Sequence, residues 1–465
     1  MTTLIPKFDF KNGGTTPTGA INRPINEKLA ETVSVLDFDA DPTGVADSTT
    51  AIQNAIDSLG TAGGTVSLSG TLKVTATITI PWNVDLVGKG SSNTIIETAF
   101  SSAIPVFVIN GSSQSSVAHF SHAGFSVNGN GVGTAFQIIQ CAYGDFTDIW
   151  TYGFALHWDL TDVLSSQWYS CGSLSGQQGL WARLGSVSAP NALSFYGCTF
   201  GSMTNVGLQL DHDSTLNYVG GSIEGCGTYP ASSTNVALLL NQPGDNGASA
   251  AILSGVYLEN NAGVGDVYLI ANTYAAYPST FTAIGCTFNR VSSTRYTNSN
   301  IYVTQGSSNA PLVVDISGSG FQGYNDYVES SARPYVDTSG VAGTFTLIEN
   351  GALYGSAVAA PTYNTAAITP GTNIDASGAP KATTGYNGVV QLSGFLHATA
   401  GVTAGQVIGT LPTRYIPSRN ISVPAINTFS GAVSYLGINT SGQLTFGQNL
   451  TSGYDCYIDG VSYKK

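Results

Sequence analysis

Charged residues, and basic residues in particular, are scarce in this sequence. Only 9% of the 465 residues are charged, and 15 lysines and arginines stand against 28 aspartates and glutamates, which gives a net charge of −13. The few basic residues never cluster into a patch that would neutralise successive phosphate groups. Nucleic acid is therefore not an expected partner.

Long apolar runs are also absent. No stretch of 18 apolar residues occurs in the sequence, whereas a membrane-spanning helix needs about 20. Lys7, Asp9 and Lys11 interrupt the N-terminal segment, which therefore lacks the apolar centre of a secretory signal. We expect a soluble chain with no membrane insertion and no secretory export.

The cysteines show no metal-binding pattern. The six residues are Cys141, Cys171, Cys198, Cys226, Cys286 and Cys456, with no CxxC pair and no histidine at ligand spacing. The sequence therefore predicts buried free thiols, no metal site and no cofactor.

What the sequence has in abundance is typical of β-structure. It contains 56 glycines, 23 tyrosines and 19 phenylalanines, besides many serines, threonines and asparagines, all of which favour turns or strands. The hydrophobic residues, 42% of the chain, are spread evenly, which excludes a disordered protein. Only one stretch has the pattern of an amphipathic helix, and this excludes an all-α or doubly wound fold.

One type of segment recurs from the middle of the chain to about residue 325, as in FYGCTFGS from Phe195 and AIGCTFNR from Ala283. Aligned, these segments place one large apolar residue of each repeat in one column: Val127, Tyr152, Leu174, Phe200, Ile223, Leu258, Phe288 and Phe321. A second type of segment lies between them and ends in a polar column of Asp159, Arg183, Asp211, Asn241, Ala271 and Gln305.

Two strand signals in every 20 to 35 residues, separated by long irregular turns, predict a parallel β-solenoid. A β-sandwich of hairpins is the alternative for residues 100 to 345, and it would place strands about every 8–12 residues with tight turns between them. The open end of a solenoid needs a cap. The amphipathic stretch 51–60, which follows the capping residues 47–50, predicts a helix there.

The segment around this helix resembles a known family. VSVLDFDADPTGVADSTTAIQ, residues 33–53, resembles the opening of pectate-lyase-like β-helix proteins, with Asp39 in place of a glycine and Ser48 in place of a second aspartate. This opening is shared by pectinases, epimerases and phage proteins, and it implies a right-handed parallel β-helix. INRPINEKLAET, residues 21–32, is similar to the neck that precedes the opening in bacteriophage tailspikes and capsule depolymerases.

A second resemblance lies near the C-terminus. GTLPTRYIP, residues 409–417, looks like a segment of the small β-sandwich domains that end phage fibres and tailspikes, where they trimerise or bind sugar. We therefore expect four parts: a neck or attachment segment at 1–32, a β-helix with the substrate-binding face at 33–350, a linker or last coils at 351–384, and a β-sandwich at 385–465.

These resemblances imply a homotrimeric phage tailspike of the virion tail, attached through its N-terminus to another tail or baseplate protein. Its expected activity is the depolymerisation of a bacterial surface polysaccharide (capsule, exopolysaccharide or O-antigen) by endo-glycosidic hydrolysis during host adsorption. Two alternatives remain open. One is a polysaccharide lyase that acts by β-elimination on a uronate-containing polymer, and the other is a non-enzymatic receptor-binding spike.

Glu224 and Glu259 are the first candidate catalytic pair. Each directly follows the apolar column, in adjacent repeats. Carboxylates one rung apart would lie about 5 Å from each other, which is near the spacing of a retaining glycosidase pair. The alternative is that both are solvated turn residues.

Asp211 and Asp213 are the second candidate pair, because two carboxylates that flank one residue of a strand face the same side. The alternative is a surface turn at a strand end. His212, Asp159 and Arg183 are expected to bind substrate nearby. Aromatic residues that would stack on sugar, or else fill the core, are Trp158, Trp168, Trp181, Tyr218 and Tyr257. If these sites fail, the next carboxylates are Asp159, Asp266, Asp315, Asp326 and Glu329, or a cleft between chains.

Overall fold

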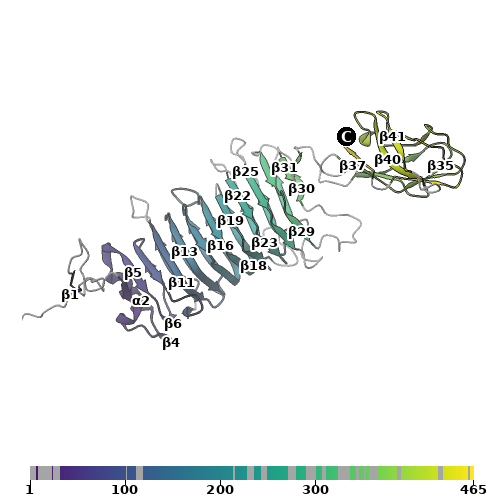
Figure 1. The fold of residues 1–465 in the computed structure, drawn as a ribbon. Helices are drawn as coiled ribbons and strands as arrows, with labels where there is room; N and C mark the ends of the chain where they lie inside the picture. Colours follow the sequence, from purple (N-terminus) through teal and green to yellow (C-terminus); the bar gives the residue numbers. More distant parts are fainter. Residues whose placement is uncertain are drawn as a thin grey trace, which may run out of the picture. The chain divides into compact units, whose positions relative to one another are not determined.

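The computed structural model describes most of the chain (Figure 1). The described residues are 7–8, 23–24, 32–100, 102–111, 119–212, 215–227, 235–241, 249–270, 279–289, 300–305, 311–322, 336–341, 345–349, 352–354, 364–384, 389–427, 433–458 and 461–464. They belong to two compact units, Met1–Ala357 and Val358–Lys465.

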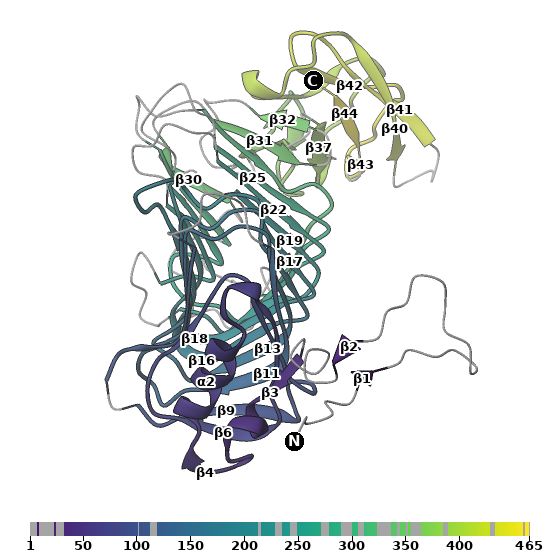
Figure 2. The same ribbon diagram turned by 90° about the vertical axis from the view of Figure 1, so that its left-hand side faces the viewer.

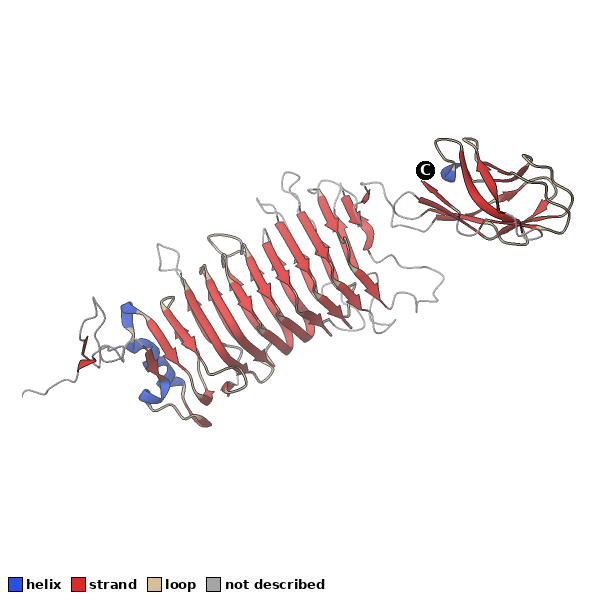
Figure 3. Cartoon of the chain, in the orientation of Figure 1, coloured by secondary structure: helices blue, strands red, loops and turns tan. Residues whose placement is uncertain are grey.

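The first unit is a parallel β-helix. Thirty strands, from β3 (Thr32–Ser34) to β32 (Ala352–Tyr354), join one sheet. Strands one coil apart pair in parallel, as β20 (Ser222–Glu224) does with β23 (Tyr257–Glu259), and Figure 3 shows the resulting stack. The predicted parallel β-helix is therefore confirmed, and the β-sandwich alternative is wrong for this part of the chain.

Each coil contributes to three faces. The first face holds β3, β5 (Gly64–Ser67), β8 (Val84–Val87), β15 (Gln167–Tyr169), β17 (Leu193–Tyr196), β19 (Thr215–Val219), β22 (Ser249–Ser254), β25 (Ser279–Ile284), β28 (Leu312–Asp315) and β31 (Phe345–Glu349). The second holds β4 (Thr43–Asp47), β6 (Gly70–Val74), β9 (Thr94–Thr98), β20, β23, β26 (Thr287–Asn289) and β29 (Gly320–Gln322). The third holds β7 (Ile78–Ile80), β10 (Pro105–Asn110), β12 (Thr134–Ile139), β14 (Leu156–Thr161), β21 (Leu238–Asn241), β24 (Val267–Ile270), β27 (Ile301–Gln305) and β30 (Val336–Val341).

Four long strands bend from one face to the next. The pairings of β11 (Phe120–Asn128) and β13 (Gly144–Tyr152) carry them from the first face to the second. Those of β16 (Gly172–Arg183) and β18 (Thr199–Asp211) lead from the second face to the third. The remaining short strands of this unit are β32, antiparallel to β31, and the antiparallel pair β1 (Lys7–Phe8) and β2 (Arg23–Pro24).

A helix caps the first coils, as predicted. Helix α2 (Thr49–Ser58) lies between two 3-10 turns, η1 (Val35–Phe38) and η2 (Gly60–Ala62), at the N-terminal end of the β-helix (Figure 2). The helix begins two residues before the expected position, and Asp47 Oδ1 accepts both the backbone N–H and the hydroxyl of Thr49 at its start. Among the described residues, no helix combines the length and apolarity that crossing a membrane requires.

Aromatic rings stacked along the axis fill much of the core. Phe136 lies 4.4 Å from Trp158, and Phe146 lies 5.1 Å from Trp168, each pair being nearly parallel. Both tryptophans are at most 1% exposed, and Tyr218 is fully buried, with its hydroxyl donating to the Cys198 and Ser222 carbonyls. The suggestion that these three aromatics stack on sugar is therefore wrong, because their rings stabilise the core instead.

The predicted apolar column is confirmed at Val127 and from Phe200 onward, but not in the two coils between them. Phe200, Ile223, Leu258, Phe288 and Phe321 are register partners in successive coils. In two earlier coils the inward position is held by the preceding polar residues Thr151 and Ser173, so Tyr152 and Leu174 belong to the outward column. A shift of one residue moves a strand side chain to the opposite face.

The cysteines behave as predicted, since all six are buried free thiols. Burial raises the pKa of the Cys226 and Cys456 thiols to about 12, which keeps them protonated and unreactive.

The second unit is a β-sandwich, as predicted. One antiparallel sheet holds β33 (Asn364–Ala367), β36 (Lys381–Thr384), β37 (Val389–Ser393) and β44 (Ser462–Lys464). The other holds β34 (Thr369–Pro370), β39 (Val407–Thr410), β42 (Gln443–Phe446), β41 (Val433–Ile438), β40 (Ile421–Asn427), β43 (Asp455–Tyr457), β38 (Phe395–Ala398) and β35 (Ile374–Asp375), with the 3-10 turn η4 (Thr413–Tyr415) between strands. The sandwich begins before residue 385: segment 364–384, expected to be linker or last coils, supplies four of its strands.

Candidate functional site

The second face presents one continuous outward column of side chains. Its members are register partners in successive coils: Glu97, Asn128, Tyr152, Leu174, Gly201, Glu224, Glu259 and Asn289. Because strand side chains alternate and the preceding residue of each strand points into the core, this column faces outward. We call it the second-face column, and it offers a straight track to an extended ligand.

Glu224 and Glu259 lie next to each other in this column, as predicted. They pair directly between β20 and β23, which places them one rung, about 4.8 Å, apart. The Asn289 amide of the following coil donates to Glu259 Oε1 at 2.8 Å and to the Tyr257 hydroxyl at 2.7 Å. No described side chain donates to the Glu224 carboxylate, so the two glutamates differ in their surroundings.

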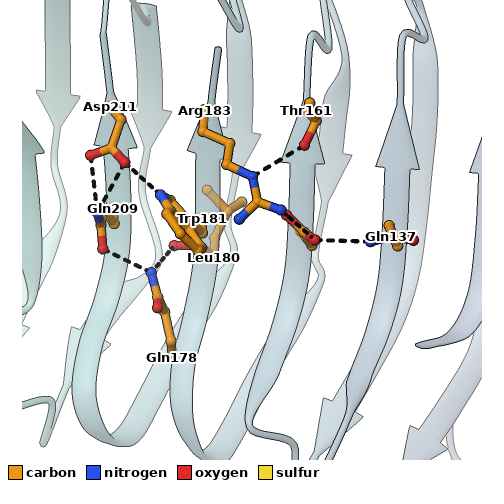
Figure 4. Close-up of polar contacts among 9 residues, drawn as sticks. Gln137, Thr161, Gln178, Leu180, Trp181, Arg183, Gln209 and Asp211 are labelled. Atoms are coloured by element: carbon orange, nitrogen blue, oxygen red, sulfur yellow. Dashed lines mark hydrogen bonds and ion pairs between the residues drawn. The ribbon is translucent and has the colours of Figure 1, made fainter. Parts of the chain in front are cut away.

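Asp211 lies on the third face and is held by several donors (Figure 4). Its carboxylate accepts hydrogen bonds from Trp181 Nε1 at 2.6 Å, from Gln209 Nε2 at 2.9 and 3.1 Å, and from Asn241 Nδ2 at 3.0 Å. The residue is only 7% exposed. These contacts favour a structural role over proton transfer to a glycan, since the carboxylate oxygens are already engaged.

Asp159 and Arg183 also belong to the third face, where they form an ion pair of 2.8 Å. The predicted polar column is wrong at this point: Arg183 pairs in register with Thr161, and Asp159 with Trp181. The guanidinium reaches diagonally to Asp159, contacts the Thr161 hydroxyl at 3.3 Å and covers the Trp181 ring at 4.1 Å. Trp181 is therefore covered on one ring face and bound at its nitrogen.

The remaining predicted residues divide between structural positions and undescribed ones. His212 directly follows β18 and has a left-handed conformation with φ 66°. Asp266 is buried and accepts hydrogen bonds from the Asn261 and Asn300 amides, and Asp315 accepts the Ser317 N–H. Asp213, Asp326 and Glu329 lie outside the described residues.

If Arg183 is structural, replacing it will lower stability without affecting a glycan ligand. Arg183→Met leaves the buried Asp159 carboxylate without its cation, and we expect the free energy of unfolding to fall by about 2 to 3 kcal/mol. Urea unfolding checks this value. Loss of polysaccharide binding with unchanged stability would instead show that Arg183 contacts the substrate.

Sequence reasoning missed a groove on the second face near the N-terminal coils. Glu97, Trp150 and Tyr152 line it. The signal was present in Trp150-Thr151-Tyr152, where two aromatics separated by one residue share a strand face, but their outward direction follows only once the register is known.

The comparisons with known proteins agree with this fold. Residues 32–143 match the family described as rhamnogalacturonase A/epimerase, pectate lyase-like. No similar sequence was found among curated proteins. Similar solved structures include the gp42 tailspike of Acinetobacter phage vb_AbaP_AS12, which is 12% identical, with 93% of this chain and 82% of that chain covered and a TM-score of 0.51.

Two further solved structures are similar at lower TM-scores. ORF18 of Geobacillus virus E2 is 18% identical over 94% of this chain and 80% of its own, with a TM-score of 0.49. The A-module of the Azotobacter vinelandii mannuronan C-5 epimerase AlgE4 is 13% identical over 68% of this chain and 95% of its own, with a TM-score of 0.43. The first coils of the parallel β-helix are thus similar in sequence to the pectate-lyase-like family over residues 32–143.

Proposed function

We propose that this protein is a phage tailspike that binds and depolymerises a bacterial surface polysaccharide by endo-glycosidic hydrolysis. The chain is similar in fold to the Acinetobacter phage tailspike, with 93% of the chain covered. The observation that carries the catalytic part is the pair Glu224 and Glu259, in register on an outward track. The spacing of one rung, about 4.8 Å, is close to the separation of the two carboxylates of a retaining glycosidase.

The surroundings of the two glutamates suggest their roles. A hydrogen bond from Asn289 stabilises negative charge on Glu259, so we assign Glu259 as the nucleophile and Glu224 as the acid. Glu224 protonates the glycosidic oxygen while Glu259 attacks the anomeric carbon and forms a glycosyl ester. Glu224, now a carboxylate, takes a proton from water, which displaces Glu259 and releases the product.

Hydrolysis is favoured over β-elimination because, among the described residues, no free cation lies close to the glutamate pair. A lyase needs a positive group close to the uronate carboxylate, and the second-face column contains none between Asn128 and Asn289. Arg183 is engaged by Asp159 on another face. Arg290, Arg295 and Arg333 lie outside the described residues.

The products of the reaction test this proposal. The protein is incubated with capsule, exopolysaccharide or O-antigen from candidate hosts, and the products are analysed by mass spectrometry. Fragments with the mass of added water support hydrolysis. A 4,5-unsaturated end would show a lyase, and intact polymer that binds would show a receptor-binding spike.

A homotrimer is part of the proposal, with residues 1–32 attaching it to another tail or baseplate protein. The third face carries the half-buried Tyr268, Ile270 and Tyr302, which pack over the buried Leu239, and the two tyrosine rings lie 5.1 Å apart; this apolar group would suit contact with a second copy. Light scattering at micromolar concentration should return about three times the 48.0 kDa chain mass. A monomer would contradict this expectation.

A further inference from the structure

The groove on the second face has the dimensions of a ligand site. Its volume is about 980 Å³, at the upper end of the range usual for small-molecule pockets. Its lining residues are Ser91, Ser92, Ile95, Glu97, Ser126, Asn128, Gly129, Trp150, Tyr152, Gly153 and Ser175. Tyr152 lies three rungs, about 14 Å, from Glu224 along the same column.

Trp150 and Tyr152 form an aromatic platform in this groove. They lie two residues apart on β13, and their ring centroids are 6.3 Å apart at an interplanar angle of 18°. A Cβ atom at Gly172 would come within 2.2 Å of Trp150 Cε3, so the indole packs directly against the glycine backbone of the next coil. A ring laid flat against the sheet leaves its other face toward the groove, where the C–H groups of a pyranose can stack.

Polar groups beside the platform are held in place. Glu97 Oε1 accepts the Asn128 amide at 2.7 Å, which orients the carboxylate. Asp148 accepts both the N–H of Ser91, at 3.0 Å, and its hydroxyl, at 2.6 Å, and so fixes the loop that supplies Ser91 and Ser92. Burial, together with the Asp148 charge, raises the pKa of the Tyr152 phenol, so its hydroxyl remains a hydrogen-bond donor.

The charges around the groove select against anionic ligands. Glu97 is the one charged residue of the lining, Asp148 binds the loop of Ser91 and Ser92, and the exposed Lys89 lies in that loop two residues before Ser91. Lys73 is the register partner of Glu97 in the preceding coil. It also pairs with Asp47, and its charge helps to lower the pKa of that carboxyl. A uronate would therefore meet net negative charge at short range, whereas a neutral sugar would not.

We propose that the groove formed by Glu97, Trp150 and Tyr152 is a binding subsite for neutral pyranosides, separate from the Glu224 and Glu259 pair. The sugar stacks on Trp150, and its hydroxyls donate to the Glu97 carboxylate and accept from Tyr152. This inference rests on the second face being a glycan track, as in the proposed function. It makes no demand on the cleavage step.

Saturation-transfer NMR on the full chain tests the subsite. The probes are methyl glycosides of glucose, galactose, mannose, N-acetylglucosamine and N-acetylgalactosamine, compared with glucuronate and galacturonate. At least one neutral glycoside should receive saturation at its ring C–H protons. We expect binding to weaken at least about tenfold in Trp150→Ala, because the stacking surface is lost. The uronates should bind at least about tenfold more weakly than that glycoside.

Three further variants separate the subsite from general effects. Gly172→Ala keeps the indole but displaces it, and Glu97→Gln keeps the shape but removes the charge, so both should weaken neutral sugars. Tyr169→Ala is the matched control, because Tyr169 is an exposed tyrosine stacked on Tyr196 at 5.1 Å on the first face. No saturation of any neutral glycoside, equal binding in Trp150→Ala, or tighter binding of uronates would overturn the proposal. Cleavage is measured separately, so failure of the subsite is distinguishable from failure of the depolymerase.

Discussion

Lowering the pH from 7 to 5 is expected to reduce the free energy of unfolding of the β-helix by about 4 kcal/mol. Two histidines inside the coils cause this loss. His122 and His157 are fully buried, and burial lowers the pKa of each imidazole from the ordinary 6.5 to about 3. Both are therefore neutral in the folded protein throughout the ordinary pH range.

The contacts of the two rings explain why neither gains a proton easily. His122 Nδ1 accepts the Leu86 N–H at 3.1 Å, so a proton on this nitrogen would displace a hydrogen bond. His157 Nδ1 lies 2.7 Å from the Thr151 hydroxyl. The Nε2 atom of each ring is buried with no hydrogen-bond partner among the described residues, so an imidazolium, which carries an N–H on both nitrogens, would leave its Nε2 N–H unsatisfied.

The direction of the effect follows from the lowered pKa values. Below about pH 6.5 the unfolded chain binds protons on both histidines, whereas the folded chain does so only near pH 3. Stability is complete above pH 6.5 and is lost progressively as the pH falls toward 3. At pH 5 each histidine is about 1.5 units below its unfolded pKa, and each unit corresponds to about 1.4 kcal/mol.

Urea unfolding at pH 7, 6 and 5 measures this loss. The double variant His122→Asn, His157→Asn is expected to be less stable at pH 7, because asparagine leaves part of each space empty, but its stability should hardly change between pH 7 and 5. His119→Asn is the matched control, since His119 is exposed. A wild-type stability that stays constant down to pH 5 would contradict the expectation.

Buried polar residues also explain where the sequence pattern predicted the register of the strands correctly and where it did not. From Phe200 onward, one large apolar residue per repeat fills the core, and alignment on that residue locates Glu224 and Glu259 correctly. In two earlier coils, Thr151 and Ser173 turn inward and hydrogen-bond each other, and Thr151 also bonds His157. Alignment on the largest residue therefore selected their outward neighbours.

The third face was harder to predict because its polar residues bind one another across coils. Arg183 forms its ion pair with Asp159, which lies two positions along β14 from Thr161, the register partner of Arg183. The alignment of the sequence repeats placed Asp159 and Arg183 in one column, although they are not register partners. Tyr218 is a similar case, since its hydroxyl finds buried carbonyl partners. Composition alone does not distinguish such a tyrosine from one that stacks on sugar.

Glu224→Gln and Glu259→Gln are each expected to lower kcat on the polysaccharide by about 100-fold or more. Each change removes the titrating group and keeps the side-chain volume, and loss of a general acid or nucleophile costs at least this much. Polymer binding and thermal stability should stay near the wild-type values, because both side chains point outward from the strands. Initial rates of reducing-end release measure the effect.

Asp211→Asn provides the matched control on the third face. Like the glutamine variants, it changes a carboxylate into an amide. The Asp211 carboxylate, however, accepts hydrogen bonds from Trp181, Gln209 and Asn241. We expect this variant to lose stability, by about 1 to 3 kcal/mol, and to keep its kcat. Asp213→Asn completes the series, since Asp213 lies outside the described residues and stays a candidate from sequence alone.

The stereochemistry of the product provides a separate test of the glutamate pair. If the two carboxylates keep the spacing of one rung of a parallel sheet, about 4.8 Å, there is no room for a water molecule between the sugar and the second carboxylate, and cleavage should retain the anomeric configuration. Proton NMR of the first-formed reducing end measures this directly. An inverted product would require carboxylates about 6.5–9.5 Å apart, which is wider than the spacing of one rung. Inversion would therefore contradict the assignment of Glu259 as nucleophile, and full activity in both glutamine variants would move the catalytic site away from β20 and β23.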